Sequence, residues 1–381
     1  MMKRILSLVV LALAVAACGQ TTPPTFDWHE TAVPTALPGT AMPAASPPPL
    51  LYIDQGGLFE QVAGEPPQRL ADVPDKCVLC GGTGAVLGAT RINDAVLVLV
   101  EQGLRRIRLA DGTSDLVLRF DVPARFGQLV ATVDGAYVIY GAVVDDPSAE
   151  FGFSTHVGLY QTSSDTAREI LFVTKNMQPL GLTADGSGLY LLPRGQDPTF
   201  GAVLVAALKD GTITAELPIE GYGGAFLSPD SLYIITNDGL FDSADRPSDE
   251  NFLSLYDLTA QPVTPRVIRP PHSPKYGGEL LWAPNSRAVH LLINTSQDEE
   301  GTAYGLWRLD VESGEMTQEA AVVPDELLGH AAVLHPVTIS PDGQWLLLRP
   351  ETENKPILVH APTGVSMVFA PPITAVVVGW R

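Results

Sequence analysis

The chain has 381 residues, including 35 glycines and 33 prolines, and a formal net charge of −20. So many Gly and Pro residues interrupt almost any stretch long enough for a core helix, which excludes a helical bundle or a coiled coil. Hydrophobic residues make up 45% of the chain and charged residues only 17%, which excludes a disordered protein. The acidity argues against a nucleic-acid partner, because phosphate binding needs a basic surface. Three cysteines are too few for a disulfide scaffold.

The first segment has the features of a secretion signal. Two basic residues at 3–4 precede an unbroken run of apolar and small residues over 5–17, which is shorter than the roughly 20 residues of a spanning helix. The run ends in V-A-A-C at Val15–Cys18, which resembles the bacterial lipobox. The resemblance implies that residues 1–17 are a lipoprotein signal peptide and that Cys18 carries the lipid. An ordinary signal peptide that contains a cysteine is the alternative.

A lipid on Cys18 implies a membrane-anchored protein on the extracytoplasmic side of the cell envelope. Residues 18–50 are rich in Pro, Thr and Ala and carry almost no charge, so they cannot bury a core. We expect an extended tether, partly in the polyproline II conformation, between the lipid and the folded domain.

From residue 51 to the end, short β-rich runs alternate with turn residues and show no helical period. Ala95–Val100, Ala136–Tyr140 and Gly188–Leu192 are examples of these runs. Even spacing of this kind is typical of a β-sandwich, a barrel or a propeller. Internal repetition decides among the three.

One turn motif recurs between an apolar run and a stronger one. Its copies are Thr132–Gly135, Thr183–Gly186, Ser228–Ser231, Ala283–Ser286 and Ser340–Gly343, with a looser copy at Thr90–Asp94. The residue types suit a tight hairpin, because Ser or Thr bonds to the nearby backbone and Asp or Asn followed by Gly accepts the left-handed position.

A second motif, an apolar strand that ends in a polar turn, follows each hairpin. Its copies are Arg106–Gly112, Leu204–Gly211, Leu255–Leu258, Leu306–Asp310 and Ile357–Gly364. Together the two motifs define a unit of four strands, a to d, in roughly 40–50 residues, which is the repeat of a propeller blade.

The two ends of the domain supply the parts of one more blade. Val376–Arg381 matches strand a, while Leu51–Asp54, Gly57–Val62 and Gln68–Ala71 match strands b, c and d. Pairing of these ends would close a ring and leave no long exposed sheet edge. We therefore predict an all-β, seven-bladed propeller over residues 51–381, with six blades as the alternative.

The S-P-D-G turns and the strand-c pattern resemble TolB-like propellers of exported bacterial proteins, and are more distantly WD-repeat-like. The sequence lacks the recurring pattern of G-H and W-D dipeptides that marks ordinary WD repeats. The resemblance implies the propeller but little about function, because the fold hosts binding modules and enzymes alike.

Cys77 and Cys80 lie in the connection between the first two blades. In an exported protein this spacing favours a local disulfide. A redox pair and a metal site are alternatives that the sequence leaves open.

Several loops on one face carry candidate binding residues, because the b–c and d–a loops of a propeller emerge together. An acidic rim is expected from Asp145, Asp146, Asp242, Asp245, Asp249, Glu250, Asp298, Glu299 and Glu300. Such a rim suits calcium or a cationic partner, and solvated loops are the alternative. His272, Lys275, Tyr276, His330 and His335 are further candidate contacts on the same face.

No catalytic motif can be read in the sequence, and no catalytic residue is assigned. Blade-end positions of the inner strands hold mostly Ala, Thr and Leu, which favours binding over catalysis. We therefore expect a protein- or ligand-binding scaffold anchored through Cys18. The alternative is a propeller enzyme, such as a hydrolase, a lyase or a cofactor-dependent dehydrogenase, with its site at the central channel.

Overall fold

The computed structural model describes eleven stretches of the chain. They are residues 46–73, 86–150, 152–194, 202–219, 224–237, 252–270, 280–294, 304–322, 334–350, 356–369 and 375–381. Within these stretches the chain forms strands and turns and contains no helix. No helix of the described residues therefore has the length and apolar character to cross a membrane.

The strands form seven antiparallel sheets of four strands each, which we number as blades 1 to 7. Blade 1 contains β28 (Val376–Trp380), β1 (Leu50–Asp54), β2 (Gly57–Gln61) and β3 (Gln68–Asp72); blade 2 contains β4 (Val86–Ile92), β5 (Ala95–Val100), β6 (Gly103–Arg108) and β7 (Ser114–Arg119); blade 3 contains β8 (Ala124–Ala131), β9 (Tyr137–Asp145), β10 (Phe153–Gln161) and β11 (Thr166–Val173). Blade 4 contains β12 (Asn176–Leu182), β13 (Gly188–Arg194), β14 (Val203–Ala207) and β15 (Ile213–Leu217); blade 5 contains β16 (Ala225–Leu227), β17 (Tyr233–Thr236), β18 (Leu253–Asp257) and β19 (Pro265–Ile268). Blade 6 contains β20 (Leu280–Trp282), β21 (Ala288–Asn294), β22 (Tyr304–Asp310) and β23 (Met316–Val322); blade 7 contains β24 (Leu334–Ile339), β25 (Trp345–Pro350), β26 (Ile357–His360) and β27 (Ser366–Val368).

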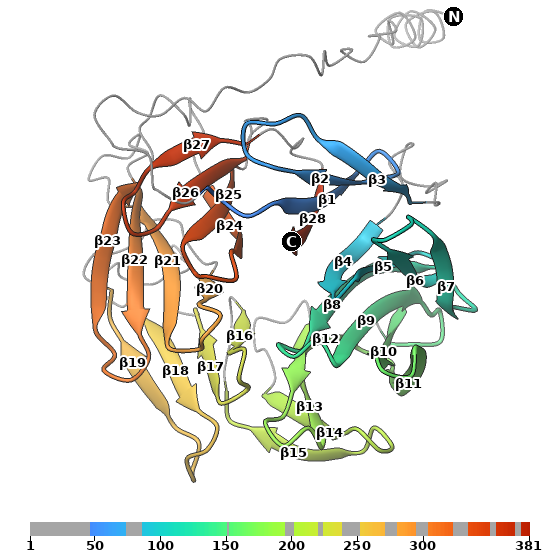
Figure 1. The fold of residues 1–381 in the computed structure, drawn as a ribbon. Helices are drawn as coiled ribbons and strands as arrows, with labels where there is room; N and C mark the ends of the chain where they lie inside the picture. The colour runs from blue at the N-terminus through green and yellow to red at the C-terminus, as the bar shows by residue number, and fades with distance from the viewer. Residues whose placement is uncertain are drawn as a thin grey trace, which may run out of the picture. The chain divides into compact units, whose positions relative to one another are not determined.

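The seven blades are arranged as a β-propeller (Figure 1). The first strand of each blade, a, lies next to the centre of the ring, and the fourth strand, d, lies at the outside. Apolar side chains from neighbouring blades pack between the sheets; one such core joins Leu97, Leu99 and Leu104 of blade 2 to Tyr140 and Tyr160 of blade 3. The predicted fold class and the seven-blade count are confirmed.

The recurring turn motif forms the a–b hairpins, as the residue types predict. In blade 3 the Thr132 hydroxyl donates to the Asp134 carboxylate over 2.6 Å and accepts the Tyr137 amide over 3.0 Å. Gly135 takes the left-handed position with φ of 64°. In blades 5 and 6 that position is held by Ser231 and Ser286, with φ of 63° and 60°.

The ring is closed by the two ends of the domain. β28 pairs antiparallel with β1, so that Leu50 is opposite Trp380 and Tyr52 is opposite Val377. The Arg381 amide also donates to the Pro49 carbonyl over 2.8 Å. The predicted closure by one C-terminal and three N-terminal strands is confirmed, with the first strand beginning at Leu50 rather than at 51.

Candidate functional site

The two faces of the propeller carry different connections. The a–b and c–d hairpins emerge on one face, which we call the hairpin face, and the b–c and d–a connections emerge on the other, the loop face. Much of the loop face lies outside the described residues. Most of the candidate site residues lie outside the described stretches and stay predictions. They are Cys18, Cys77, Cys80, Asp242, Asp245, Asp249, Glu250, His272, Lys275, Tyr276, Asp298, Glu299, Glu300 and His330.

Asp145 and Asp146 are the part of the predicted acidic rim that the structure describes. Both lie where β9 ends and the b–c loop of blade 3 begins. Asp145 forms an exposed ion pair with Arg125 over 2.6 Å. Asp146 accepts hydrogen bonds from the side chains of Ser148 and Ser154, each over 2.5 Å, and these bonds lower the pKa of its carboxyl group.

His335 lies in a different element from the one expected. The sequence placed it in a d–a loop, whereas it lies near the start of β24, the inner strand of blade 7. It is opposite Arg349 of β25 and half-buried. Its position is still at the loop-face end of the blade, because strand a runs from the loop face to the hairpin face.

A cavity of about 520 Å³ opens on the loop face between blades 2 and 3. The β7–β8 connection of blade 2 forms one wall, with Phe120, Asp121 and Val122. Strands β9, β10 and β11 of blade 3 form the other. Asp145 and Asp146 line the same cavity, so two residues of the predicted rim belong to a formed pocket.

A β-bulge brings the lining residues of blade 3 onto one face of its sheet. His156 is opposite Phe172, but Gly158 is opposite Glu169, because the register between β10 and β11 shifts after Val157. Without this shift Glu169 and Phe172 would point to opposite faces, since side chains alternate along a strand. The bulge therefore places His156, Glu169 and Phe172 on the face that lines the cavity.

His156 is held between two aromatic rings. Its imidazole stacks on Phe120 with ring centroids 6.0 Å apart and meets Phe172 at 4.7 Å in a tilted arrangement. The Nδ1 atom of His156 contacts the carboxylate of Glu169. These contacts fix the ring in place and leave Phe172 46% exposed at the mouth of the cavity.

Tyr140 of β9 forms part of the inner wall. Its ring lies over Gly158, where a Cβ atom would be 2.2 Å from the phenol oxygen. Tyr140 is only 1% exposed, and burial, together with the charge of Glu169, raises the pKa of its hydroxyl. Within the described part of the chain, this hydroxyl has no hydrogen-bond partner. Because Tyr140 lines the cavity, its hydroxyl is a group that a ligand can reach.

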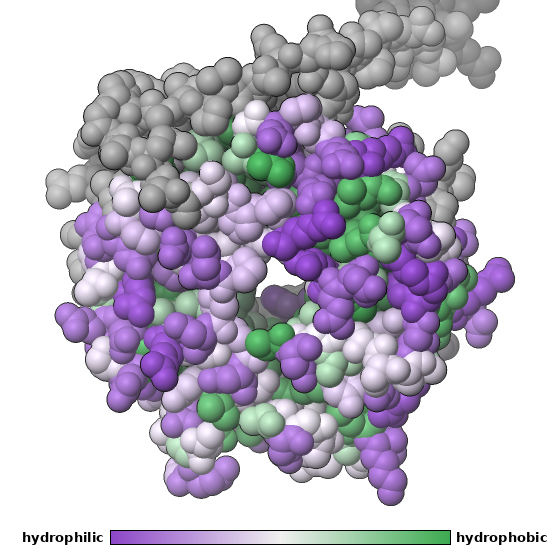
Figure 2. All heavy atoms as spheres, viewed as in Figure 1, coloured by the Kyte–Doolittle hydropathy of each residue, from purple (hydrophilic) through white to green (hydrophobic). Residues whose placement is uncertain are grey.

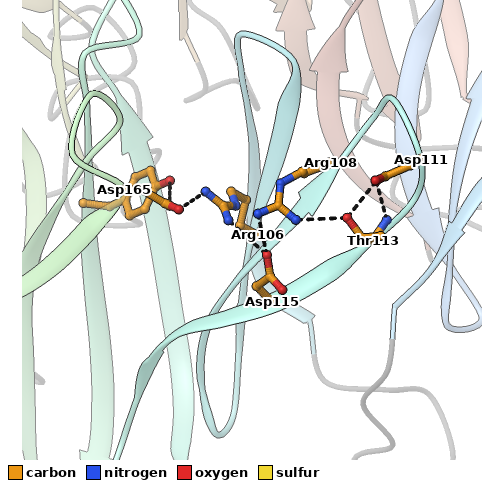
Figure 3. Close-up of polar contacts among 7 residues, drawn as sticks. Arg106, Arg108, Asp111, Thr113, Asp115 and Asp165 are labelled. Atoms are coloured by element: carbon orange, nitrogen blue, oxygen red, sulfur yellow. Dashed lines mark hydrogen bonds and ion pairs between the residues drawn. The ribbon is translucent and has the colours of Figure 1, made fainter.

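Blades 2 and 3 are also joined at the hairpin face, by a network of charged side chains (Figure 3). Arg106 of β6 contacts the carboxylate of Asp165 in blade 3 and donates to Asp115 of β7 over 3.0 Å. Tyr160 donates to Asp165 over 2.6 Å. Burial lowers the pKa of Arg106, but its hydrogen bonds to the two carboxylates outweigh that effect and raise it. Because these side chains are matched to one another, the network is a structural contact between blades.

The centre of the ring remains open in the space-filling view (Figure 2). Polar side chains of the inner strands are joined to neighbouring blades there. Arg91 donates to the Trp380 carbonyl over 2.9 Å, and Gln128 donates to the Pro179 carbonyl over 2.5 Å. These two bonds join the inner strands of adjacent blades. Within blade 4, Arg194 of β13 donates to Gln178 of β12 over 2.5 Å, and burial lowers the pKa of its guanidinium.

Metal ligands do not gather in the part of the chain that the structure describes. No group of three or more His, Cys, Asp or Glu side chains is close enough there to hold an ion. The expected calcium site therefore depends on acidic loops, at 242–250 and 298–300, that lie outside the described stretches.

Comparison with known proteins identifies the fold class. No family model and no curated protein matches the chain. Among solved structures, oligogalacturonate lyase from Vibrio parahaemolyticus is 12% identical with a TM-score of 0.54, over 83% of each chain. Puromycin hydrolase is 14% identical with a TM-score of 0.52, over 87% of this chain and 55% of that one. TolB from Acinetobacter baumannii is also matched, at 14% identity and a TM-score of 0.40, over 74% of this chain and 67% of that one.

The chain is thus a seven-bladed β-propeller, similar in fold to two enzymes of different activity. At these identities the likeness shows the fold alone.

Most residues of the cavity were not predicted from the sequence. Asp145 and Asp146 were, because they follow a strand at a loop. Glu169 and the residues with rings, such as Phe120 and His156, were not, because they lie within strands or a short connection and carry no motif. The apolar run Ile170–Val173 at the end of β11, the outer strand of the blade, is the one signal in the sequence that points to this cavity.

Proposed function

We propose that this chain is a lipid-anchored, extracytoplasmic propeller that binds a ligand or a protein partner at its loop face. The observation that supports this most is the cavity between blades 2 and 3, which presents aromatic rings and carboxylates on one face of a closed ring. A closed propeller is a rigid support for loops, and binding residues concentrate on such loops.

The expected tether agrees with this proposal. The chain enters the ring at Leu50, opposite Trp380 at the hairpin-face end of β28. This point of entry is on the face opposite to the loop face, so the start of the ring does not cover the cavity.

Anchoring is tested by replacing the expected lipid site. Cys18→Ala should move the protein from the membrane fraction to the soluble fraction and abolish labelling by a radioactive fatty acid. Cys77→Ala is the matched control and should stay in the membrane and keep its label. Fatty-acid labelling that persists in Cys18→Ala would contradict lipidation at this residue.

Binding is tested by native mass spectrometry of the full chain, purified in detergent from the cells that make it. We expect a bound compound or partner that Phe172→Ala releases and that Val133→Ala, a change at an exposed turn residue, retains. If the captured compound is instead converted to a product during incubation, the protein is an enzyme and not a binding scaffold.

A further inference from the structure

The cavity between blades 2 and 3 has a chemistry that selects its ligand. We propose that it binds an organic cation, namely a protonated amine, amidine or guanidine carried on a flat apolar body. This inference rests on the proposed binding function and names the ligand class of that site.

The charge of the cavity favours a cation. Asp121, Asp145, Asp146 and Glu169 contribute four carboxylates, against the single guanidinium of Arg119. Asp121 is exposed and, among the residues that the structure describes, has no ion pair or hydrogen bond. Its carboxylate is thus available to a cationic ligand in the cavity. The net charge of −20 on the whole chain adds a long-range attraction for cations.

The remaining carboxylates are not equally free. Asp145 is paired with Arg125 at the surface, and the Asp146 carboxylate accepts hydrogen bonds from Ser148 and Ser154 within its own loop. The Glu169 carboxylate contacts the imidazole of His156. Asp121 is therefore the residue that we assign to the charged end of the ligand.

The apolar surface of the cavity suits a flat body. Phe172 is 46% exposed and Val122 is 42% exposed, although both lie beside buried side chains. Aromatic faces attract cations and pack against planar groups. A ligand between Phe172 and the β7–β8 connection would cover both exposed apolar side chains.

The hydroxyl of Tyr140 supplies a third recognition element. It lines the cavity near Glu169 and has no hydrogen-bond partner in the described chain, although the tyrosine is 1% exposed. An N–H group of the ligand can donate a hydrogen bond to this oxygen. A volume of about 520 Å³ is in the range of pockets for small molecules, so the ligand is of that size.

The test uses three probes of equal shape and different charge: benzamidine, benzamide and benzoate. Calorimetric titration of the full chain in detergent at low salt should show benzamidine binding at least tenfold more tightly than benzamide, and benzoate not binding. Asp121→Asn and Tyr140→Phe should each weaken benzamidine binding about fivefold or more, as typical for a lost charged or hydrogen-bonded contact. Asp72→Asn, which removes the same charge from blade 1, should leave binding unchanged.

Tyr140→Phe keeps the ring over Gly158, so a loss of binding in this variant cannot be a loss of folding if its melting temperature is unchanged. Equal affinity for benzamidine and benzamide would overturn the cation assignment. So would the absence of benzamidine binding, or binding that survives both variants. If a neutral or anionic compound is nevertheless captured and released by Phe172→Ala, the binding function stands and only the ligand class is wrong.

Discussion

Leu50 and Trp380 are paired across two antiparallel strands, although one begins the propeller and the other nearly ends it. Trp380 is 6% exposed and packs in a core with Leu50 and Trp345. Its carbonyl also accepts a hydrogen bond from Arg91 of blade 2. This one residue therefore joins blade 1 to both of its neighbours and completes the ring.

Removal of this closure should destabilise the whole domain. Trp380→Ala is expected to lower the free energy of unfolding by about 3–5 kcal/mol, because it deletes a buried aromatic side chain. Deletion of residues 374–381 should abolish cooperative unfolding, since blade 1 loses its inner strand. The measurement is thermal and urea unfolding followed by circular dichroism.

The matched control is Val133→Ala at a residue that is 71% exposed, and it should change stability by less than about 0.5 kcal/mol. An unchanged melting temperature after the deletion would mean that closure does not stabilise the ring.

Two serines in left-handed positions allow a test of the turn chemistry. Ser231→Gly should raise stability by about 1 kcal/mol, because Gly adopts positive φ without strain. Ser286→Gly should give little or no gain, because the Ser286 hydroxyl accepts the Asp230 amide of blade 5 over 2.9 Å and this bond would be lost. Urea unfolding of both variants checks the difference, and an equal gain in both would show that the bond contributes nothing.

Stability should fall in acid because the turn aspartates are hydrogen-bonded in the folded state. Bonds from Thr183 and Ser187 lower the pKa of Asp185 to about 2, and bonds from Thr132 and Ala136 lower the pKa of Asp134. A pKa that is lower in the folded than in the unfolded state contributes stability above the unfolded value near 4, and this contribution is lost as the pH falls through the folded value.

The melting temperature should therefore decrease steadily from pH 5 to pH 2. Thr183→Val removes the largest cause of the Asp185 shift and should flatten this decrease, whereas Val133→Ala should leave its slope unchanged. If the melting temperature of Thr183→Val falls with pH as steeply as that of the unmodified protein, the hydrogen bond from Thr183 to Asp185 is not a cause of the acid sensitivity.

Arg106 and Arg108, the two arginines of the charge network between blades 2 and 3, should contribute unequally to the free energy of unfolding. Arg106 is 14% exposed and contacts two carboxylates, so Arg106→Ala should cost about 2 kcal/mol, because Asp165 loses its positively charged partner and keeps the bond from Tyr160. Arg108 is 42% exposed, and Arg108→Ala should cost less than about 1 kcal/mol. Denaturant unfolding at low and high salt measures both, and equal costs would mean that the network is no more than a surface ion pair.

The overall architecture could be predicted because its signals are local. Each hairpin is specified by a Ser, Thr or Ala, an Asp or Asn, and a residue that accepts positive φ, all within four positions. Repetition of this unit and the unpaired strand at 376–380 then predict the closed ring, since any other arrangement leaves a sheet edge exposed. The a–b turns and the Leu50–Trp380 pairing follow from these signals.

The cavity could not be predicted, because its residues meet only in the folded protein. Strict alternation along β11 would put Glu169 and Phe172 on opposite faces, and it is the bulge in the β10–β11 pairing that brings them together beside His156. Phe120 and Asp121 come from a different blade altogether. The repeat, the turn geometry and the closure depend on neighbouring residues and on strand order, so they can be predicted from the sequence. Which strand residues line a cavity depends on the register between strands and on the packing of one blade against the next, so it is known only from the folded protein.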